Sequence, residues 1–281
     1  MPLKGTVRMS DNAIGIFDSG LGGLTAVKEL IKVLPHENII YFGDTARVPY
    51  GNKSRRTIIR YAEQDADFLL SRGVKMIIAA CGTVSSVAVN LKDELPVPFT
   101  GVVAPTALAA ANATKSGRIG VIGTSATVNS GSYKNALLRL DSSFSVFQQD
   151  CPLFVSLVEN SFISPDDDIV KLVVERYLHS LKEQHIDTLI LGCTHFPIIA
   201  EAISDYLEGK VTLIDSGRET ALFAAGILEE HKLLNRSTEP GACRYYVSDT
   251  VEDFRRTAEI FLGKNVGSEV SHINLEHAFV H

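Results

Sequence analysis

Cys81 and Cys193 are the residues of this sequence whose type and position are best suited to chemistry. Each follows a short apolar run, and each is followed closely by small polar residues: Gly82 and Thr83 in one case, Thr194 in the other. If each cysteine begins a helix, the N-terminus of that helix is expected to lower the pKa of the thiol, and the thiolate is the reactive form. Such a pair could transfer protons or act as nucleophiles.

Other interpretations of the cysteines compete with this one. A buried cysteine is commonly just a small apolar residue. Cys193 and His195 could form half of a zinc site, but a second pair of ligands is missing, so no metal site is predicted. A single cysteine–histidine pair could transfer acyl groups, but this would leave Cys81 unexplained. Cys151 and Cys243 lack the same setting and are assigned to structure, and all four cysteines are expected to be free thiols.

Two further loops follow apolar runs. The segment 17–24, Phe-Asp-Ser-Gly-Leu-Gly-Gly-Leu, precedes an expected helix and suits either a carboxylate ligand or a tight turn. It does not fit a dinucleotide-binding pattern, because Thr25 stands where the third glycine belongs, nor does it fit a phosphate-binding loop. The segment 43–51 is long for a simple connection, which favours a functional loop over a structural turn.

The elements that must position these residues are short strands and helices in alternation. Runs rich in Ile and Val predict buried parallel strands at 13–17, 38–42, 76–80, 118–122, 188–191, 211–214 and 244–247. Alternation with helices predicts an α/β fold of parallel sheets covered by helices. Ligands of such sheets bind beyond the carboxyl ends of the strands, where both cysteines are expected.

Two of the expected helices have readable boundaries. The segment 54–71 has apolar residues at helical spacing, and Gly73 is expected to end that helix. Ser164 is predicted to cap a second helix, with Pro165 in its first turn. The apolar stripe of that helix is predicted to lie in the core; it consists of Ile169, Leu172, Val173, Tyr177, Leu178 and Leu181.

The chain also repeats itself. The strand before Asp18 precedes Cys81 by about the same distance as the strand before Gly123 precedes Cys193. We therefore predict two similar parallel-sheet α/β domains. The first is discontinuous and comprises residues 1–103 and 215–281, and the second comprises residues 104–214.

Composition excludes several classes of protein. The chain has 281 residues, 45% apolar and 21% charged, with a net charge of -6. The short basic run 53–56 is not the patch of a nucleic-acid-binding protein. Residues 1–12 lack the apolar stretch of a signal peptide, and the segment 101–113 is too short to span a bilayer. A cytoplasmic protein without nucleic-acid or membrane partners is expected.

With these motifs in register over nearly the whole chain, the sequence resembles the glutamate racemase family. The resemblance rests on residues 17–24, 43–51 and 191–197, together with Cys81. It implies two α/β domains related by pseudo-twofold symmetry, with the active site in the cleft between them. It also implies a homodimer that acts on L- and D-glutamate without a cofactor, and a role in supplying D-glutamate for peptidoglycan.

The resemblance also implies residue roles. Cys81 would exchange the α-proton of D-glutamate with support from Asp18. Cys193 would do so for L-glutamate, with support from His195 and Glu159. The residues implied in binding substrate are Asp18, Ser19, Pro49, Tyr50, Gly51, Gly82, Thr83 and Thr194.

The sequence departs from the family at one site residue. The family usually has asparagine after the first cysteine, and this chain has Gly82, whose backbone N–H could still donate a hydrogen bond. Two alternatives stay open at this point. One is an aspartate racemase or another amino-acid racemase of the same superfamily. The other is a two-lobed amino-acid-binding protein without turnover, whose ligand binding would survive loss of either thiol.

Overall fold

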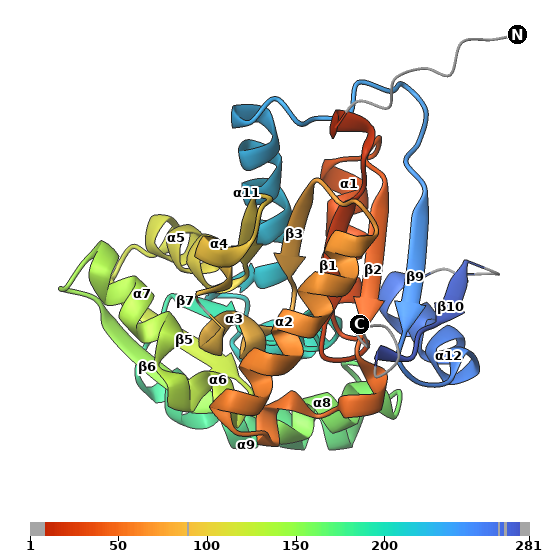
Figure 1. Cartoon of the computed structure of the whole chain (residues 1–281). Coiled ribbons are helices and arrows are strands. Elements are labelled where there is room, and N and C mark those ends of the chain that lie inside the picture. Colours follow the sequence, from red (N-terminus) through yellow and green to blue (C-terminus); the bar gives the residue numbers. More distant parts are fainter. Residues whose placement is uncertain (1–8, 89, 264, 267–268, 276–281) are drawn as a thin grey trace, which may run out of the picture.

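The computed structural model describes residues 9–88, 90–263, 265–266 and 269–275. Two separate parallel sheets, each flanked by helices, make up the molecule (Figure 1). This confirms the predicted fold class. The boundaries predicted for the two domains stay a prediction, and part of the segment 1–12 examined for a signal peptide lies outside the described residues.

The first sheet uses both ends of the chain. Within the described residues its order is β10-β9-β2-β1-β3-β4, with every neighbouring pair parallel. Its strands are β1 (Ile14–Asp18), β2 (Ile39–Gly43), β3 (Met76–Ala79), β4 (Phe99–Gly101), β9 (Cys243–Val247) and β10 (Val270–His272). The second sheet, also parallel, has the order β6-β5-β7-β8. Its strands are β5 (Arg118–Gly123), β6 (Ser145–Asp150), β7 (Thr188–Leu191) and β8 (Thr212–Asp215).

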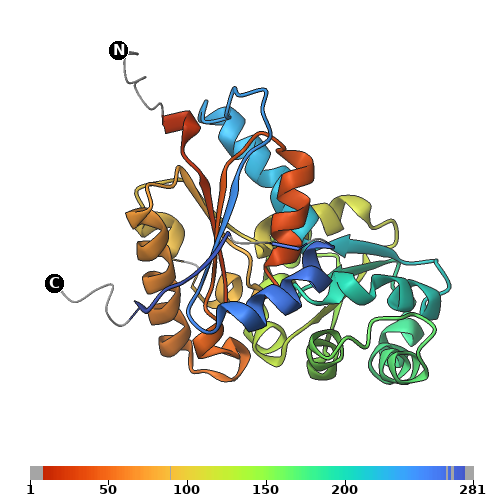
Figure 2. The same cartoon turned by 90° about the vertical axis from the view of Figure 1, so that its right-hand side faces the viewer.

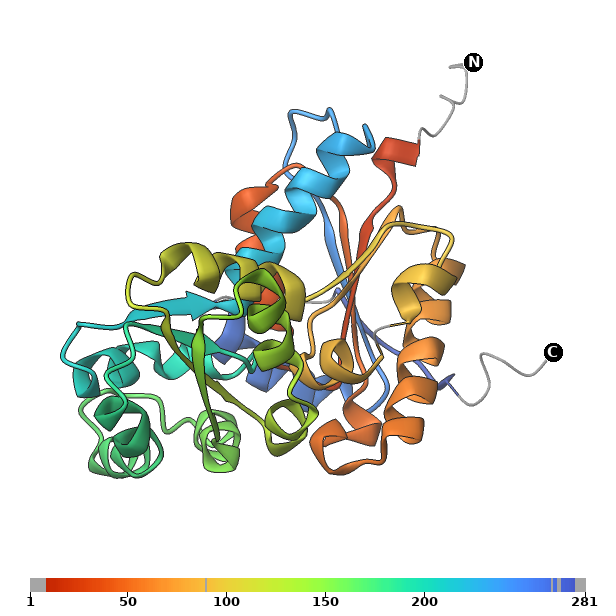
Figure 3. The same ribbon diagram turned by 90° about the vertical axis from the view of Figure 1, so that its left-hand side faces the viewer.

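Helices cover both faces of the first sheet. The helix α2 (Arg55–Ser71) lies on one side, and α1 (Leu24–Val33), α11 (Ser216–Glu230) and α12 (Val251–Leu262) lie on the other (Figure 2). The second side faces the second sheet (Figure 3). The remaining helices are α3 (Gly82–Val87), α4 (Leu91–Glu94), α5 (Val103–Ala113), α6 (Ser125–Ser130), α7 (Ser132–Leu140), α8 (Pro152–Glu159), α9 (Asp168–Glu183) and α10 (Ala200–Tyr206). Short 3-10 helices are η1 (Met9–Asp11), η2 (Thr45–Arg47), η3 (Tyr50–Asn52) and η4 (Phe196–Ile199).

One apolar core joins the two halves. Ile14 and Val27 of the first half are fully buried in the same cluster as Phe196 and Leu178 of the second half, and Phe261 of α12 belongs to it too. Each fully buried large apolar side chain contributes roughly 1.5–3 kcal/mol. The shared cluster therefore stabilises the contact between the halves as well as each half.

Most predicted elements are present. The seven predicted strands correspond to β1, β2, β3, β5, β7, β8 and β9. The helix α2 begins as expected, with the hydroxyl of Ser54 accepting a hydrogen bond from the backbone N–H of Thr57 at 3.3 Å. Gly73 follows its end with φ +71°, a conformation that favours glycine. No helix among the described residues is long and apolar enough to cross a membrane.

The prediction for α9 was wrong in two respects. Its cap is Asp167, not Ser164, because the Asp167 carboxylate accepts hydrogen bonds from the first N–H groups of the helix, at 2.8 and 3.3 Å. Ile169 and Leu172 are 50% and 65% exposed. The buried face of α9 is instead the row spaced by three and four residues that meets the core: Val170, Val174, Leu178 and Leu181.

Candidate active site

Both cysteines lie where the sequence placed them, beyond the carboxyl ends of parallel strands. Cys81 follows β3, the neighbour of β1, and precedes α3. Cys193 follows β7, the neighbour of β5, and precedes a turn and then η4 in place of the expected helix. The two thiols thus occupy matching positions in the two sheets. This is the location at which parallel sheets bind ligands.

The Cys81 thiol is buried beside Asp18 and Ser19. Its Sγ donates to the hydroxyl of Ser19 at 3.4 Å. Burial, together with the charge of Asp18, raises the pKa of Cys81 to about 12. Burial also raises the pKa of Asp18, against the hydrogen bonds that its carboxylate accepts from the backbone N–H groups of Gly23 and Gly20. The expectation that the helix N-terminus lowers the pKa of this thiol was wrong, because loss of solvent outweighs it.

The Cys193 thiol has different partners. Its Sγ lies 3.8 Å from Nδ1 of His195, and Nε2 of His195 lies 3.2 Å from the Glu159 carboxylate. Burial lowers the pKa of His195, but hydrogen bonds with Cys193 and Glu159 outweigh burial and raise it to about 10. The raised pKa favours the protonated ring. It can hold a proton next to Sγ, as a proton-transfer site needs.

The loops that carry the two cysteines are in contact. A Cβ atom on Gly82 would stand 2.5 Å from the carbonyl oxygen of Gly192, so only a residue without a side chain fits at position 82 with the backbones where they are. Similarly, a Cβ atom on Gly22 would stand 2.1 Å from Oγ1 of Thr194. The site is therefore assembled from both halves at close quarters. Gly82, the departure from the family pattern, lies at one of these close approaches.

Most of the predicted binding residues gather here. Ser19, Thr83 and Thr194 are buried or half-buried within the contact between the halves. Oγ1 of Thr83 lies 3.3 Å from Oγ1 of Thr124, which follows β5 in the second half. Sequence reasoning did not select Thr124. The internal repeat could have found it, because Thr124 follows β5 as Ser19 follows β1.

The loop at 48–51 lies against both halves of the molecule. The Val48–Pro49 peptide bond is cis. The Tyr50 ring is buried, and its hydroxyl donates within the first half, to Asp44. Gly51 lies against the second half, since a Cβ atom there would stand 3.7 Å from Thr124. The Tyr50 hydroxyl is therefore occupied by partners within the first half.

The other two cysteines lie in structural positions. Cys151 is fully buried in the core cluster shared by the two halves, and Cys243 begins β9. All four cysteines are free. Among the described residues, no group of three or more His, Cys, Asp or Glu side chains could hold a metal ion.

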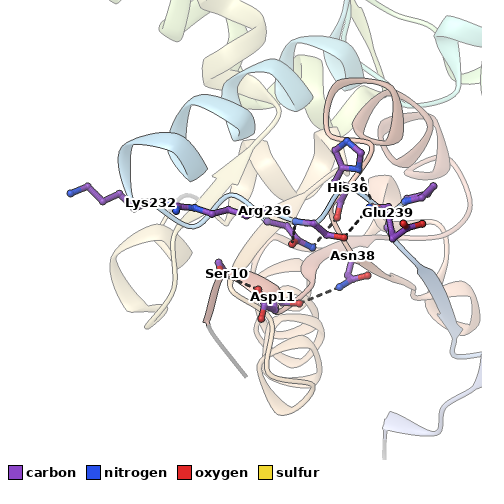
Figure 4. Close-up of a pocket in the computed structure, with 11 residues that line it drawn as sticks. Ser10, Asp11, His36, Asn38, Lys232, Arg236 and Glu239 are labelled. Atoms are coloured by element: carbon purple, nitrogen blue, oxygen red, sulfur yellow. Dashed lines mark hydrogen bonds between the residues drawn. The ribbon is translucent and has the colours of Figure 1, made fainter. Parts of the chain in front are cut away.

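A separate cavity of about 650 Å³ lies at the other end of the first sheet, where β1 and β2 begin (Figure 4). It is lined by the segment after α11, with His36 and Asn38 opposite. Nδ1 of His36 lies 3.0 Å from the carbonyl oxygen of Glu239, and Asn38 donates to the carbonyl oxygen of Asp11 at 3.1 Å. These side chains join connecting segments at the edge opposite the cysteines.

Comparison with known proteins places this fold among racemases, which are isomerases. The family model described as Asp/Glu/Hydantoin racemase matches residues 24–224, and the chain belongs to this family.

Within the family, the chain is similar to glutamate racemases. It is 45% identical to the glutamate racemase of Geobacter metallireducens over 94% of this chain and 97% of the relative. It is 46% identical to that of Chlorobaculum tepidum over 90% and 93%. Among solved structures, the glutamate racemase of Francisella tularensis in complex with D-glutamate matches with a TM-score of 0.88 and 40% identity, over 95% of this chain and 99% of that one.

Proposed function

We propose that this chain interconverts L-glutamate and D-glutamate without a cofactor, with Cys81 and Cys193 as the two proton-transfer groups. The observation that carries the proposal is the contact between the two cysteine loops, which come from different halves and have thiols of matching position. Inversion at the α-carbon needs a proton removed from one face and another delivered to the opposite face. Two groups on opposite walls meet that need, whereas a single base would tend to return the proton to the face it came from.

In the direction from D- to L-glutamate, the Cys81 thiolate removes the α-proton and becomes a thiol. The electron pair left on the α-carbon is delocalised into the substrate carboxylate. The Cys193 thiol then delivers its proton to the opposite face of the α-carbon and becomes a thiolate. The reverse direction exchanges the two roles, so atoms and charge balance in both.

Each thiol must then be reset by a neighbour. Asp18, whose pKa is raised by burial, is placed to accept a proton from Cys81. His195 is placed to return one to Cys193. Because the unliganded Cys81 thiol has a pKa raised to about 12, we expect the thiolate to form when the positively charged ammonium group of the substrate enters the site. Backbone N–H groups following β3 and β7 are the expected donors to the substrate carboxylate.

The test is solvent deuterium incorporation at the α-carbon of L- and D-glutamate in D2O. We expect the purified wild type to exchange and racemise both isomers with no cofactor added. Cys81→Ser and Cys193→Ser should each lose racemisation by about 10²-fold or more, because a serine hydroxyl is a far weaker acid–base group. Each variant should lose proton removal from one isomer more than from the other. The isomer affected assigns the role of each thiol. Cys151→Ser is the matched control and should stay active.

Three outcomes would count against the proposal. Absence of exchange with either isomer of glutamate, alongside exchange with aspartate, would reject the substrate. Full activity in both cysteine variants would reject the mechanism. Binding of glutamate without any exchange would favour a non-catalytic binding protein.

The same proposal includes a metabolic role, a cellular location and an oligomeric state. D-glutamate from this reaction would supply peptidoglycan synthesis, which rescue of a bacterial strain that requires D-glutamate would test. A cytoplasmic location is tested by cell fractionation. A homodimer is tested by sedimentation equilibrium of the purified protein with and without glutamate.

A further inference from the structure

A network of buried polar side chains lies behind the loop at 48–51. Asp44 and Asp65 are fully buried, the Tyr50 side chain lies between them, and Arg47 contacts both carboxyl groups. The four residues come from three neighbouring places: the end of β2, the short helices η2 and η3, and the middle of α2. Two acidic groups this close in a dry site raise the question of how many charges the network holds.

Asp44 is ionised, according to its hydrogen bonds. One of its oxygens accepts from the hydroxyl of Ser248 at 2.8 Å. The other accepts from Nε of Arg47 and from the hydroxyl of Tyr50. Nε–H of Arg47 can only donate, and a carboxylate can accept all three of these contacts, so we assign the negative charge to Asp44. The Arg47 guanidinium balances the charge.

Asp65 has a different set of partners. Its Oδ1 accepts from Nη2 of Arg47 at 2.8 Å, but its Oδ2 lies 3.1 Å from the hydroxyl oxygen of Tyr50. That hydroxyl has one proton, which we assign to the contact with Asp44, the carboxyl group that also accepts from Nε of Arg47. A second proton is needed between Tyr50 and Asp65, and only the Asp65 carboxyl can supply it. Burial and the charge of Asp44 raise the pKa of Asp65, against the charge of Arg47, and Asp18 adds to the rise.

The network fixes the loop that touches both halves of the site. The backbone N–H of Asp44 donates to the carbonyl oxygen of Asp18 at 3.0 Å. Val48 packs on Gly20, where an added Cβ atom would stand 2.9 Å from its Cγ1. Gly51 faces Thr124 of the second half. Displacement of Tyr50 would therefore disturb the loop beside Cys81 and the contact with the second half together.

We propose that Asp65 is held as a neutral acid that donates to Tyr50, which in turn donates to the Asp44 carboxylate, and that Asp65 thereby acts as a positioning residue for the loop at 48–51. The effect of this series of hydrogen bonds on turnover rests on the proposed racemase function. Its effect on folding stability does not.

The test compares one chemical change at two positions. Asp65→Asn places an amide N–H where the acid proton lies and keeps an acceptor for Arg47, so kcat and KM should stay within about twofold of wild type. Asp44→Asn removes the negative charge beside Arg47 and turns an amide N–H group toward one of the groups that donate to Asp44. It should lower kcat/KM by about tenfold or more, with a fall in Tm. Asp65→Ala removes both hydrogen bonds and should show the same fall in kcat/KM and Tm. It serves as the comparison if Asp44→Asn does not fold well enough to assay.

The pH dependence gives a second readout. Asp65 titrates near pH 3.9 in the unfolded chain and higher in the native protein, so wild-type stability falls as the pH rises above about 4 towards the native pKa. Asp65→Asn lacks this loss. In urea unfolding at several pH values, the stability of Asp65→Asn relative to wild type should therefore rise with pH through this range.

The outcomes separate the two proposals. If Asp65→Asn is as damaging as Asp44→Asn, or if the stability difference is independent of pH, Asp65 is ionised and the inference is overturned. If the stability results come out as expected but the wild type does not racemise glutamate, the network stands and the proposed function fails.

Discussion

At the scale of single residues, the two thiols differ in how their protons are held. Cys81 lies beside a carboxyl group and a hydroxyl, and burial keeps it a thiol. Cys193 lies beside His195, which Glu159 holds in its charged form. The Glu159 side chain is 48% exposed, so solvent weakens its hold on His195 and the effect of removing it is modest.

Glu159→Gln should lower the pKa of His195, because it removes a negative partner from a buried ring. NMR titration of the ring protons measures this directly. Under the proposed function, kcat at neutral pH should fall by about threefold, and the alkaline limit of activity should move to lower pH. Glu183→Gln, a change of the same kind on the surface of α9, should leave the titration of His195 unaltered. An unchanged pKa in Glu159→Gln would show that Glu159 does not support the ring.

The raised pKa of His195 also links it to stability. The ring titrates near pH 6.5 in the unfolded chain and near 10 in the native protein, so the stability it contributes is complete below pH 6.5 and is lost as the pH rises through about 10. In His195→Asn, urea unfolding between pH 7 and 10 should lack this contribution, and the pH dependence of stability should be flatter than in wild type.

Residue types and spacing could predict where Cys81 and Cys193 lie in the fold but not their pKa. The positions of Cys81 and Cys193 at strand ends were readable from apolar runs. Whether a thiol is charged depends on its solvent exposure and on neighbours far away in the chain, such as Asp18 for Cys81. The ionisation of Asp65 likewise depends on Asp44, which only the fold brings to it.

At the scale of elements, the sequence predicted every central strand and the edge strand β8, and it missed three other edge strands. The missed strands are β4, β6 and β10, each at an edge of its sheet. An edge strand has a neighbour on one side alone, so it tolerates polar residues such as Gln148 and Gln149 in β6 and lacks a continuous apolar run. The start of α9 was misread for a related reason. Several residues near it can cap a helix, and tertiary packing selects among them.

The observed cap of α9 can be tested by substitution. Asp167→Ala should lower the free energy of unfolding by about 1 kcal/mol, because two N–H groups of the first turn lose their acceptor. Ser164→Ala is the matched control. Its hydroxyl accepts one weak hydrogen bond, from Asp166 at 3.3 Å, and its loss should cost less than about 0.5 kcal/mol. Equal losses in urea unfolding would indicate that the helix begins at Ser164 after all.

At the scale of the whole molecule, the halves meet through a few hydroxyl groups above the shared core. The Thr25 hydroxyl of α1 lies 2.8 Å from the carbonyl oxygen of Gly22 and 3.0 Å from that of Thr194 in the other half. A hydroxyl donates one proton, so these two carbonyl groups compete for it. Thr25 therefore has one acceptor within its own half and a second across the contact between the halves.

Thr25→Val should weaken the contact between the halves, because it removes this hydroxyl while keeping the size and shape of the side chain. A lost hydrogen bond of about 0.5–1.5 kcal/mol corresponds to about a two- to tenfold rise in KM for glutamate under the proposed function. Thr25→Ser keeps the hydroxyl and should restore most of the affinity. Steady-state kinetics of both variants decide the matter. An unchanged KM in Thr25→Val would show that the Thr25 hydroxyl does not contribute to substrate binding through the contact between the halves.

The unlike partners of the two thiols have a consequence for what the molecule can and cannot favour. Mirror-image isomers have equal free energies in water, so the equilibrium constant between them is one, and no catalyst shifts it. Under the proposed function, kcat/KM must therefore be the same for both isomers, however different the surroundings of Cys81 and Cys193 are. The asymmetry appears only as a joint change in kcat and KM, with the isomer that is bound more tightly also turned over more slowly. A mutation in either half changes kcat/KM by the same factor for both isomers. The balance between the isomers is then left to the reactions that consume them.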